Sequence, residues 1–308
     1  MTMPLHPMLQ AMVDKAAGLP PLQSFTPAEI RATDLARYAK VPRPPVASVE
    51  DRMIPGPRGD IRIRIYRPDL ADGHPIITFL HGSGFVICSI DTHDGLCRQL
   101  CLRARAVVVS VDYALAPEYK FPAGPDDCLA ATLWVSANAT HLGGDPGAHS
   151  LAGDSAGGTM AIVTAMRLRD AGGPPIKAQL LMYPVTDYPD RMPLSYVERG
   201  EGFGLTADAM RYFWGHYLKD AAEGAHPHAS PLRASDFTGL PVTYIMTADY
   251  DPLRDEGEAL AAKLEQAGVD ITLIRYDDMN HGFMSWVGIL HRSDEALEAA
   301  CAWLKAKL

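Results

Sequence analysis

The chain has 308 residues, of which 47% are hydrophobic and 21% are charged, so it can bury a sizeable core and is not a disordered polypeptide. Its net charge of -9, without any cluster of lysine and arginine, argues against nucleic acid or an anionic membrane as the main partner. No apolar run reaches the roughly 18 residues that a membrane-spanning helix needs.

The N-terminal stretch lacks the basic and apolar regions that are typical of a signal peptide, and we expect none. The five cysteines are an odd number, and the nearest two, Cys97 and Cys101, form no C-x-x-C pair. These observations favour reduced thiols and a cytoplasmic protein over a disulfide framework or a zinc site.

The predicted elements begin with helical patterns in residues 1 to about 45, which proline-rich joints interrupt. Next, "IRIRIY" (61–66) alternates apolar and polar residues, which predicts a strand with one solvent-exposed face. Short apolar runs follow at 75–80, 105–113, 149–153, 177–184, 242–248 and 271–276. Most are separated by segments of helical length, including 125–139, 156–170 and 254–267. Strands that alternate with helices predict a mainly parallel sheet with helices on both faces.

Residues 186 to about 230 interrupt this alternation, because they are too long for one crossover and are rich in aromatic residues and methionine. They are either an ordinary pair of surface helices or an insertion that covers the carboxyl ends of the strands. We favour the second interpretation, because ligands of open α/β sheets bind at those ends. The chain then divides into an N-terminal cap segment (1–45), a catalytic domain in two parts (46–185 and 231–308) and a cap insertion (186–230).

The stretch "AGDSAGG" (152–158) places a serine in a tight turn between a predicted strand and a predicted helix. Gly153, Ser155 and Gly157 match G-x-S-x-G, the nucleophile elbow, in which side chains at the flanking positions would collide with the strand or the helix. The helix N-terminus behind the serine favours negative charge that develops there. The pattern also arises by chance, but its strand–turn–helix setting predicts that Ser155 is a nucleophile.

A serine hydroxyl needs a base, and after an elbow of this kind the acid and then the histidine follow along the chain. Only His281 and His291 follow Ser155 with a plausible acid between. His291 begins the last predicted helix, whereas His281 lies in the loop after the strand at 271–276. We therefore predict His281 as the base.

The acid is expected on the loop after the preceding strand, where Asp249, Asp251 and Asp255 compete. Asp255 would already lie in a helix. Asp251 precedes a proline, which suits the last extended residue before a helix, so we prefer it and keep Asp249 as the alternative. A carboxylate there would fix the tautomer of His281 and stabilise its protonated form.

A second serine lies in "HGSGF" (81–85), directly after the early strand at 75–80. Enzymes with a nucleophile elbow stabilise the oxyanion with the N–H of the residue after the nucleophile. A second backbone N–H comes from a glycine-rich loop that follows an early strand. The predicted oxyanion donors are therefore the N–H groups of Ser83, Gly84 and Ala156. Ser83 as the nucleophile is the weaker alternative, since no turn into a helix follows it. We expect His81 to shape the loop.

Four motifs together resemble the hormone-sensitive-lipase-like group of α/β-hydrolase esterases. They are "HGSGF", "DYALAPEYKFPA", "GDSAGG", and "DPLRDEG" followed by "HGF", in the order that the family has. The resemblance covers nearly the whole chain, including the cap-like segment at 195–218. It implies an α/β-hydrolase fold with a helical cap, a triad at Ser155, Asp251 and His281, and oxyanion donors at the three positions named above.

The chain departs from the family pattern twice: Ser83 replaces a glycine, and Ala114 replaces an arginine. The first change leaves a hydroxyl beside the expected oxyanion hole, and the second removes a side chain whose role we expect to be structural. The resemblance implies hydrolysis of esters with short or medium acyl chains without a metal or cofactor, and a homodimer is possible. Independently, no H-E-x-x-H or P-loop occurs, and Ile87 stands where a dinucleotide fingerprint needs glycine.

The substrate is expected to be a small ester held by apolar walls. The side chains proposed for these walls are Phe85, Val86, Phe203, Leu205, Met210, Phe213, Trp214, Leu253 and Phe283. Each of them is also an ordinary core residue in the simpler interpretation. Two other functions stay open: an amidase, formamidase or lactone hydrolase with the same triad, and a ligand-binding protein of this fold without turnover. The presence of His281 disfavours the second.

Overall fold

An eight-stranded sheet forms the centre of the computed structural model, which describes residues 3–308. Its order is β1-β2-β4-β3-β5-β6-β7-β8. The strands are β1 (Ser48–Gly56), β2 (Gly59–Arg67), β3 (His74–Leu80), β4 (Val107–Val111), β5 (Gly144–Asp154), β6 (Ala178–Met182), β7 (Val242–Tyr250) and β8 (Ile271–Asn280). Strands β3 to β8 are parallel, whereas β2 is antiparallel to both β1 and β4. The predicted mainly parallel sheet is confirmed.

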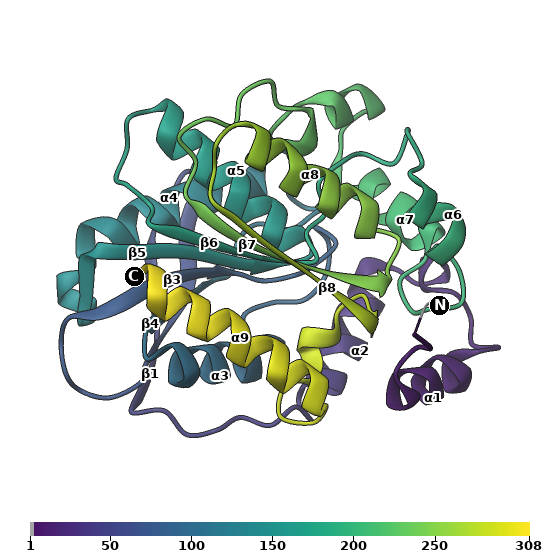
Figure 1. Cartoon of the computed structure of the whole chain (residues 1–308), viewed down its shortest axis with the longest axis horizontal. Helices are drawn as coiled ribbons and strands as arrows, with labels where there is room; N and C mark the ends of the chain where they lie inside the picture. Colours follow the sequence, from purple (N-terminus) through teal and green to yellow (C-terminus); the bar gives the residue numbers. More distant parts are fainter. Residues whose placement is uncertain (1–2) are drawn as a thin grey trace.

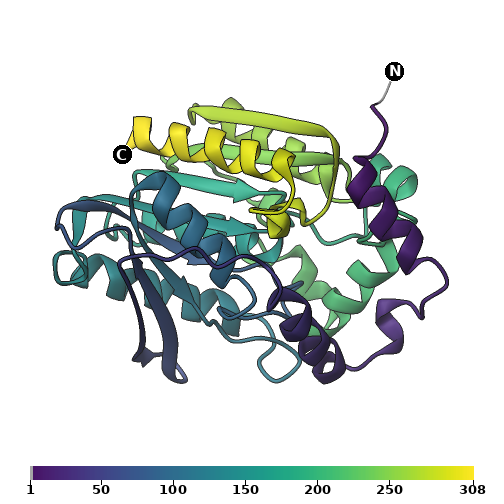
Figure 2. The same cartoon turned by 90° about the horizontal axis from the view of Figure 1, so that it is seen from below.

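Helices cover both faces of this sheet. Figure 1 shows α4, α5 and α8 on one face and α3 and α9 on the other, and Figure 2 shows the second face from below. The helices are α1 (Pro7–Ala16), α2 (Pro27–Tyr38), α3 (Asp94–Ala104), α4 (Ala123–Asn138), α5 (Ala156–Asp170), α6 (Leu194–Arg199), α7 (Ala207–Tyr217), α8 (Arg254–Gln266) and α9 (His291–Lys307). None within residues 3–308 is long and apolar enough to cross a membrane.

The burial of β4 and of most of β2 follows from their sequences. All five residues of β4, "VVVSV", are buried, because helices cover this strand on both faces. In β2 the isoleucines at 61, 63 and 65 are buried while the arginines between them are partly exposed, as the alternation predicts. Tyr66, at the end of this alternation, is buried as well. The sequence patterns do not predict β1. Ile54 is the one buried residue of this strand, which is held at the edge of the sheet by antiparallel pairing with β2.

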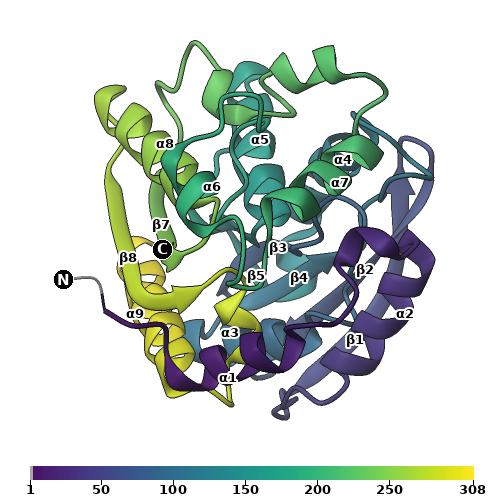
Figure 3. The same ribbon diagram turned by 90° about the vertical axis from the view of Figure 1, so that its right-hand side faces the viewer.

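Helices α1, α2, α6 and α7 gather beyond the carboxyl ends of the parallel strands (Figure 1), and Figure 3 looks onto this end of the sheet. The N-terminal segment and the insertion between β6 and β7 therefore lie over the same edge. They are joined where the Tyr212 hydroxyl of α7 donates to the Phe25 carbonyl at 2.9 Å. Arg31 of α2 binds the Val86 carbonyl and the Glu118 carboxylate, both at 2.8 Å.

Candidate active site

Ser155 occupies the sharp turn between β5 and α5, with φ 53° and ψ -122°. A positive φ is uncommon for a residue other than glycine, and such strained residues concentrate at functional sites. The backbone holds the turn from both sides: Ser155 N–H donates to the Met182 carbonyl at 2.8 Å, and the Ser155 carbonyl accepts from Val185 N–H at 3.2 Å. The side chain stays 8% exposed at the carboxyl end of the sheet.

Small residues around Ser155 are required by close backbone contacts. A Cβ on Gly153 would collide with the carbonyl of Gly157, and one on Gly157 would collide with the carbonyl of Leu80. The helix and the two neighbouring strands thus approach one another through backbone atoms alone. This is the packing that the G-x-S-x-G pattern predicts.

His281 joins Ser155 to Asp251 through two hydrogen bonds. Its Nε2 lies 2.9 Å from Ser155 Oγ, and its Nδ1 lies 2.7 Å from Asp251 Oδ2. Asp251 is fully buried, and its second oxygen accepts the N–H of Leu253 at 2.8 Å. A carboxylate only accepts hydrogen bonds, so Nδ1 carries a proton and Nε2 is left to accept the serine proton. The three residues come from the loops after β5, β7 and β8.

The competing acids and base lie elsewhere. The Asp249 carboxylate pairs with Arg199 at 2.8 Å and with Arg254 at 3.1 Å. Asp255 lies in the first turn of α8 and accepts the N–H of Ser195 at 2.7 Å. His291 begins α9 and its side chain is 88% exposed. None of these three is hydrogen-bonded to Ser155 or His281.

The HGSGF loop (residues 81–85) passes beside Ser155 and is held by a buried row of hydroxyls. Ser83 Oγ accepts the N–H of Phe85 at 2.9 Å and lies 2.8 Å from the Tyr113 hydroxyl. The Tyr113 hydroxyl donates to the carbonyl of His81 at 2.6 Å, so the proton between the two hydroxyls belongs to Ser83. The Ser83 hydroxyl therefore donates its proton to the Tyr113 oxygen, and in the described chain no histidine accepts it.

The three N–H groups predicted as oxyanion donors are unoccupied by protein acceptors. Within residues 3–308, neither Ser83 N–H nor Gly84 N–H forms a hydrogen bond. Ala156 is the first residue of α5, where an N–H has no partner inside its helix. Gly84 has φ 50°, which glycine adopts without strain. The N–H of Gly82, the residue before Ser83, differs from these three because it donates to Asp154 Oδ1 at 2.7 Å.

Asp154, next to the serine, anchors the loop electrostatically. Burial by itself would raise the pKa of its carboxyl, but the nearby His93 imidazole and the Gly82 N–H outweigh burial and lower it. His93 Nε2 lies 3.3 Å from Asp154 Oδ1. His81 is fully buried against Tyr113, with ring centroids 4.5 Å apart, and burial lowers its pKa to about 3. His81 is therefore a neutral packing group.

The predicted pocket-wall side chains divide between the two cores of the protein. Seven of them pack in the core that contains Ala156, namely Phe85, Val86, Leu205, Met210, Phe213, Trp214 and Leu253. Phe203 and Phe283 belong to the second core, on the side of β8 and α9. Phe213 of α7 lies against the HGSGF loop, because a Cβ on Gly84 would lie 2.6 Å from its ring.

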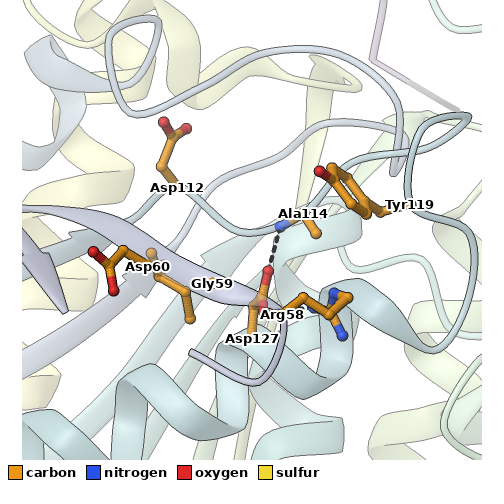
Figure 4. A pocket seen from close by; sticks show the side chains of 8 residues that line it. Arg58, Gly59, Asp60, Asp112, Ala114, Tyr119 and Asp127 are labelled. Atoms are coloured by element: carbon orange, nitrogen blue, oxygen red, sulfur yellow. Dashed lines mark hydrogen bonds and ion pairs between the residues drawn. The ribbon is translucent and has the colours of Figure 1, made fainter. Parts of the chain in front are cut away.

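A separate cavity of about 170 Å³ lies away from these residues, beside Ala114 (Figure 4). It is lined by Arg58, Gly59, Asp60, Ile61, Asp112, Ala114, Tyr119 and Asp127. Asp127 accepts the N–H of Ala114 at 2.9 Å, and burial raises the pKa of Asp112. Within the described residues, no three His, Cys, Asp or Glu side chains are placed to hold a metal ion.

Sequence reasoning missed three residues that support the site: Tyr113, Asp154 and Tyr183. Tyr113 and Asp154 lie inside the motifs "DYALAPE" and "GDSAGG", so the sequence indicates that their positions matter. It does not indicate which residues they contact. Tyr183 follows β6 in "LLMYP" and contacts His281. A single apolar run conveys no sign of such a contact.

Known proteins resemble this chain in sequence and in fold. A family model described as an α/β hydrolase fold matches residues 77–285. The chain is 41% identical over 280 residues to Esterase LipI of Mycobacterium tuberculosis, covering 88% of this chain and 87% of that protein. It is 38% identical over 295 residues to Carboxylesterase NlhH of the same organism, covering 92% of each.

Among solved structures, the hyperthermophilic esterase of the archaeon Pyrobaculum calidifontis superimposes with a TM-score of 0.92 at 39% identity, covering 99% of both chains. The predicted family, fold and enzyme class, carboxylic ester hydrolase, are confirmed by these similarities. The chain belongs to the hormone-sensitive-lipase-like esterases of the α/β-hydrolase fold.

Proposed function

We propose that this protein hydrolyses carboxylic esters of short to medium acyl chain length through an acyl-enzyme on Ser155. The observation that carries the proposal is the row of hydrogen bonds from Asp251 through His281 to Ser155 Oγ, at 2.7 and 2.9 Å. These distances lie within the range that a general base and a nucleophile require.

In the first half-reaction, Ser155 Oγ attacks the ester carbonyl carbon while its proton passes to His281 Nε2. The carbonyl electron pair moves onto oxygen, and the resulting oxyanion accepts hydrogen bonds from Ser83, Gly84 and Ala156 N–H. The bond to the alkoxy oxygen then breaks, that oxygen takes the proton from His281, and the alcohol leaves. Asp251 stabilises the imidazolium that exists between the two proton transfers.

In the second half-reaction, water attacks the acyl carbon and gives a proton to His281. Collapse of the second tetrahedral intermediate releases the carboxylic acid, and Ser155 recovers its proton from His281. Acid should therefore reduce turnover, because a protonated His281 cannot accept the serine proton. The cycle needs neither a metal nor a cofactor.

A cap made of residues 1–45, of which 1–2 lie outside the described residues, and of residues 186–230 would set the substrate size. Its support is the placement of α7 over the HGSGF loop, with the Phe213 ring packed on Gly84. Phe85, one residue further along the loop, is stacked on Tyr217 of α7 with centroids 4.0 Å apart. Such a tight apolar wall beside the oxyanion donors favours a short acyl group. The homodimer and the cytoplasmic location remain predictions.

The test is a series of activated esters of graded acyl length, run beside matched amides and lactones. The proposal expects the highest kcat/KM on soluble short or medium esters, and a covalent phosphonate adduct on Ser155. Ser155→Ala, the matched control, should lose both turnover and labelling. A maximum on long insoluble triglycerides would overturn the chain-length proposal, and higher activity on amides or lactones would overturn the ester preference.

A further inference from the structure

Tyr183 is held in an unusual backbone conformation between two contacts with the Ser155 turn. It follows β6 with φ 38°, which is rare for a bulky aromatic residue. The residue before it, Met182, accepts Ser155 N–H at 2.8 Å, and Val185 donates to the Ser155 carbonyl at 3.2 Å. Tyr183 N–H itself donates to the Met246 carbonyl of β7 at 2.7 Å. Its backbone is thus tied to the serine turn and to the neighbouring strand.

The side chain of Tyr183 projects from this fixed backbone against the loop that carries the base. Its ring meets the His281 imidazole with centroids 4.9 Å apart and an interplanar angle of 63°. It meets the Phe283 ring at 5.4 Å and 60°. Both geometries are edge-to-face, which aromatic rings prefer. The side chain is 1% exposed, so the contacts are made without water.

The hydrogen bond to Asp251 does not by itself fix the plane of the imidazole, on which the hydrogen bond to Ser155 depends. The bond between His281 Nδ1 and Asp251 Oδ2 sets one corner of the ring but allows the ring to swing about that contact. A swing would carry Nε2 away from Ser155 Oγ. A rigid neighbouring ring opposes this motion by steric contact and dispersion.

We infer that Tyr183 is a positioning residue, which holds the His281 ring in line with Ser155 by linking the serine turn to the base loop. The inference rests on the proposed function of Ser155 and His281. The ring is the part of Tyr183 that meets His281. Within residues 3–308 the buried Tyr183 hydroxyl forms no hydrogen bond with His281.

The experiment compares Tyr183→Leu and Tyr183→Phe with the parent protein on one short activated ester. Active sites are first counted by phosphonate titration, so that kcat is expressed per working site. We expect Tyr183→Leu to lower kcat per site by about ten- to a hundredfold with little change in KM, as for a misplaced reacting group. Tyr183→Phe keeps the ring and should stay within about threefold of the parent.

A purely structural role would give a different result: fewer active sites would react with the phosphonate, and each reactive site would keep the kcat of the parent. That result, or a kcat per site in Tyr183→Leu within twofold of the parent, would overturn the inference. The control is Tyr276→Leu, since Tyr276 packs on Phe283 at 5.1 Å and, in the described chain, makes no ring contact with His281. Its kcat per site should not change.

Should Tyr183→Leu fail to fold, Tyr183→Met serves in its place, because the flexible methionine side chain fills irregular space without a flat ring. The same two outcomes apply to it. Failure of the proposed function is recognised separately: the parent protein itself would then neither turn over esters nor label at Ser155. A parent that is active beside an unaffected Tyr183→Leu contradicts only the role of Tyr183.

Discussion

The side-chain hydroxyls of Ser83 and Tyr113 lie 2.8 Å apart beneath the HGSGF loop. Ser83 stands where the family has glycine, and its hydroxyl connects the Phe85 N–H to Tyr113 and through it to the His81 carbonyl. The serine side chain therefore adds hydrogen bonds to this loop that a glycine at the same position could not form.

Ser83→Gly should lower the free energy of unfolding by about 1–2 kcal/mol, because a buried N–H and a buried hydroxyl lose their partner. We expect turnover to stay within tenfold of the parent, since the N–H of residue 83 is retained. Urea unfolding and steady-state kinetics measure the two effects. Ser155→Ala is the contrasting variant, which should lose turnover while its stability stays nearly unchanged. Loss of turnover in Ser83→Gly together with retained turnover in Ser155→Ala would make Ser83 the nucleophile.

Asp251→Asn should reduce kcat by about 10⁴, because an amide favours the wrong tautomer of His281. Asp249→Asn should leave kcat within a few fold. It should instead destabilise the protein by about 3 kcal/mol, since Arg199 and Arg254 lose part of a buried ion pair. Kinetics and urea unfolding of both variants distinguish the two aspartates, and a large kcat loss confined to Asp249→Asn would exchange their roles.

Phe213→Ala should shift the preferred acyl chain towards longer esters. Removal of the ring opens space directly beside Gly84, and each extra methylene buried there contributes up to about 0.8 kcal/mol to binding. We expect kcat/KM to rise on the longer members of the ester series and to fall on the acetate. The control is Tyr212→Ala, because the Tyr212 ring lies nearer the protein surface on the same helix. An unchanged acyl-length profile in Phe213→Ala would show that Phe213 does not form part of the acyl wall.

His149 should make the protein less stable in acid. Burial lowers its pKa to about 4, while the unfolded chain binds a proton at this residue below about pH 6.5. Above pH 6.5 His149 is neutral in both the folded and the unfolded chain, so it does not change the free energy of unfolding. Between pH 6.5 and about 4 the free energy of unfolding falls by about 1.4 kcal/mol for each pH unit of acidification. The folded imidazole is neutral between Thr78 and Ser136, both at 2.9 Å.

His149→Gln removes this titration and should reduce the slope of unfolding free energy against pH by about one proton. The measurement is urea unfolding at several pH values between 4.5 and 7.5. His141→Gln, which removes an imidazole at an exposed position, is the matched control variant. Equal slopes in the parent and in His149→Gln would mean that the folded protein protonates His149 as readily as the unfolded chain does.

Ala114→Arg should stabilise the protein by up to about 1 kcal/mol, the usual size of a partly exposed ion pair. The new side chain would enter the cavity of Figure 4 and approach the carboxylates of Asp112 and Asp127. Ala114→Met fills similar space without charge and is the matched control in thermal unfolding. A variant with arginine that is less stable than the one with methionine would show that the cavity does not favour a cation.

Much of the fold was predictable because it depends on local patterns. Buried parallel strands are short apolar runs, and β2 alternates, so each could be recognised without its neighbours. The edge strand β1 was not predictable, because its mostly exposed residues form neither an apolar run nor a clear alternation, and only pairing with β2 makes them a strand. Helix bounds at α4, α5 and α8 lie within two residues of those expected.

The order of the motifs along the chain by itself determined the fold family and the choice of Ser155, Asp251 and His281 as candidates, because glycines at the turn and residues after strand ends have recognisable spacing. Only the tertiary structure decided which hydrogen bonds form. It turned Asp249 towards two arginines, engaged the Ser83 hydroxyl with Tyr113, and set Tyr183 against His281. Those contacts join residues from separate strands and loops, and their geometry depends on side-chain packing that no single stretch of sequence contains.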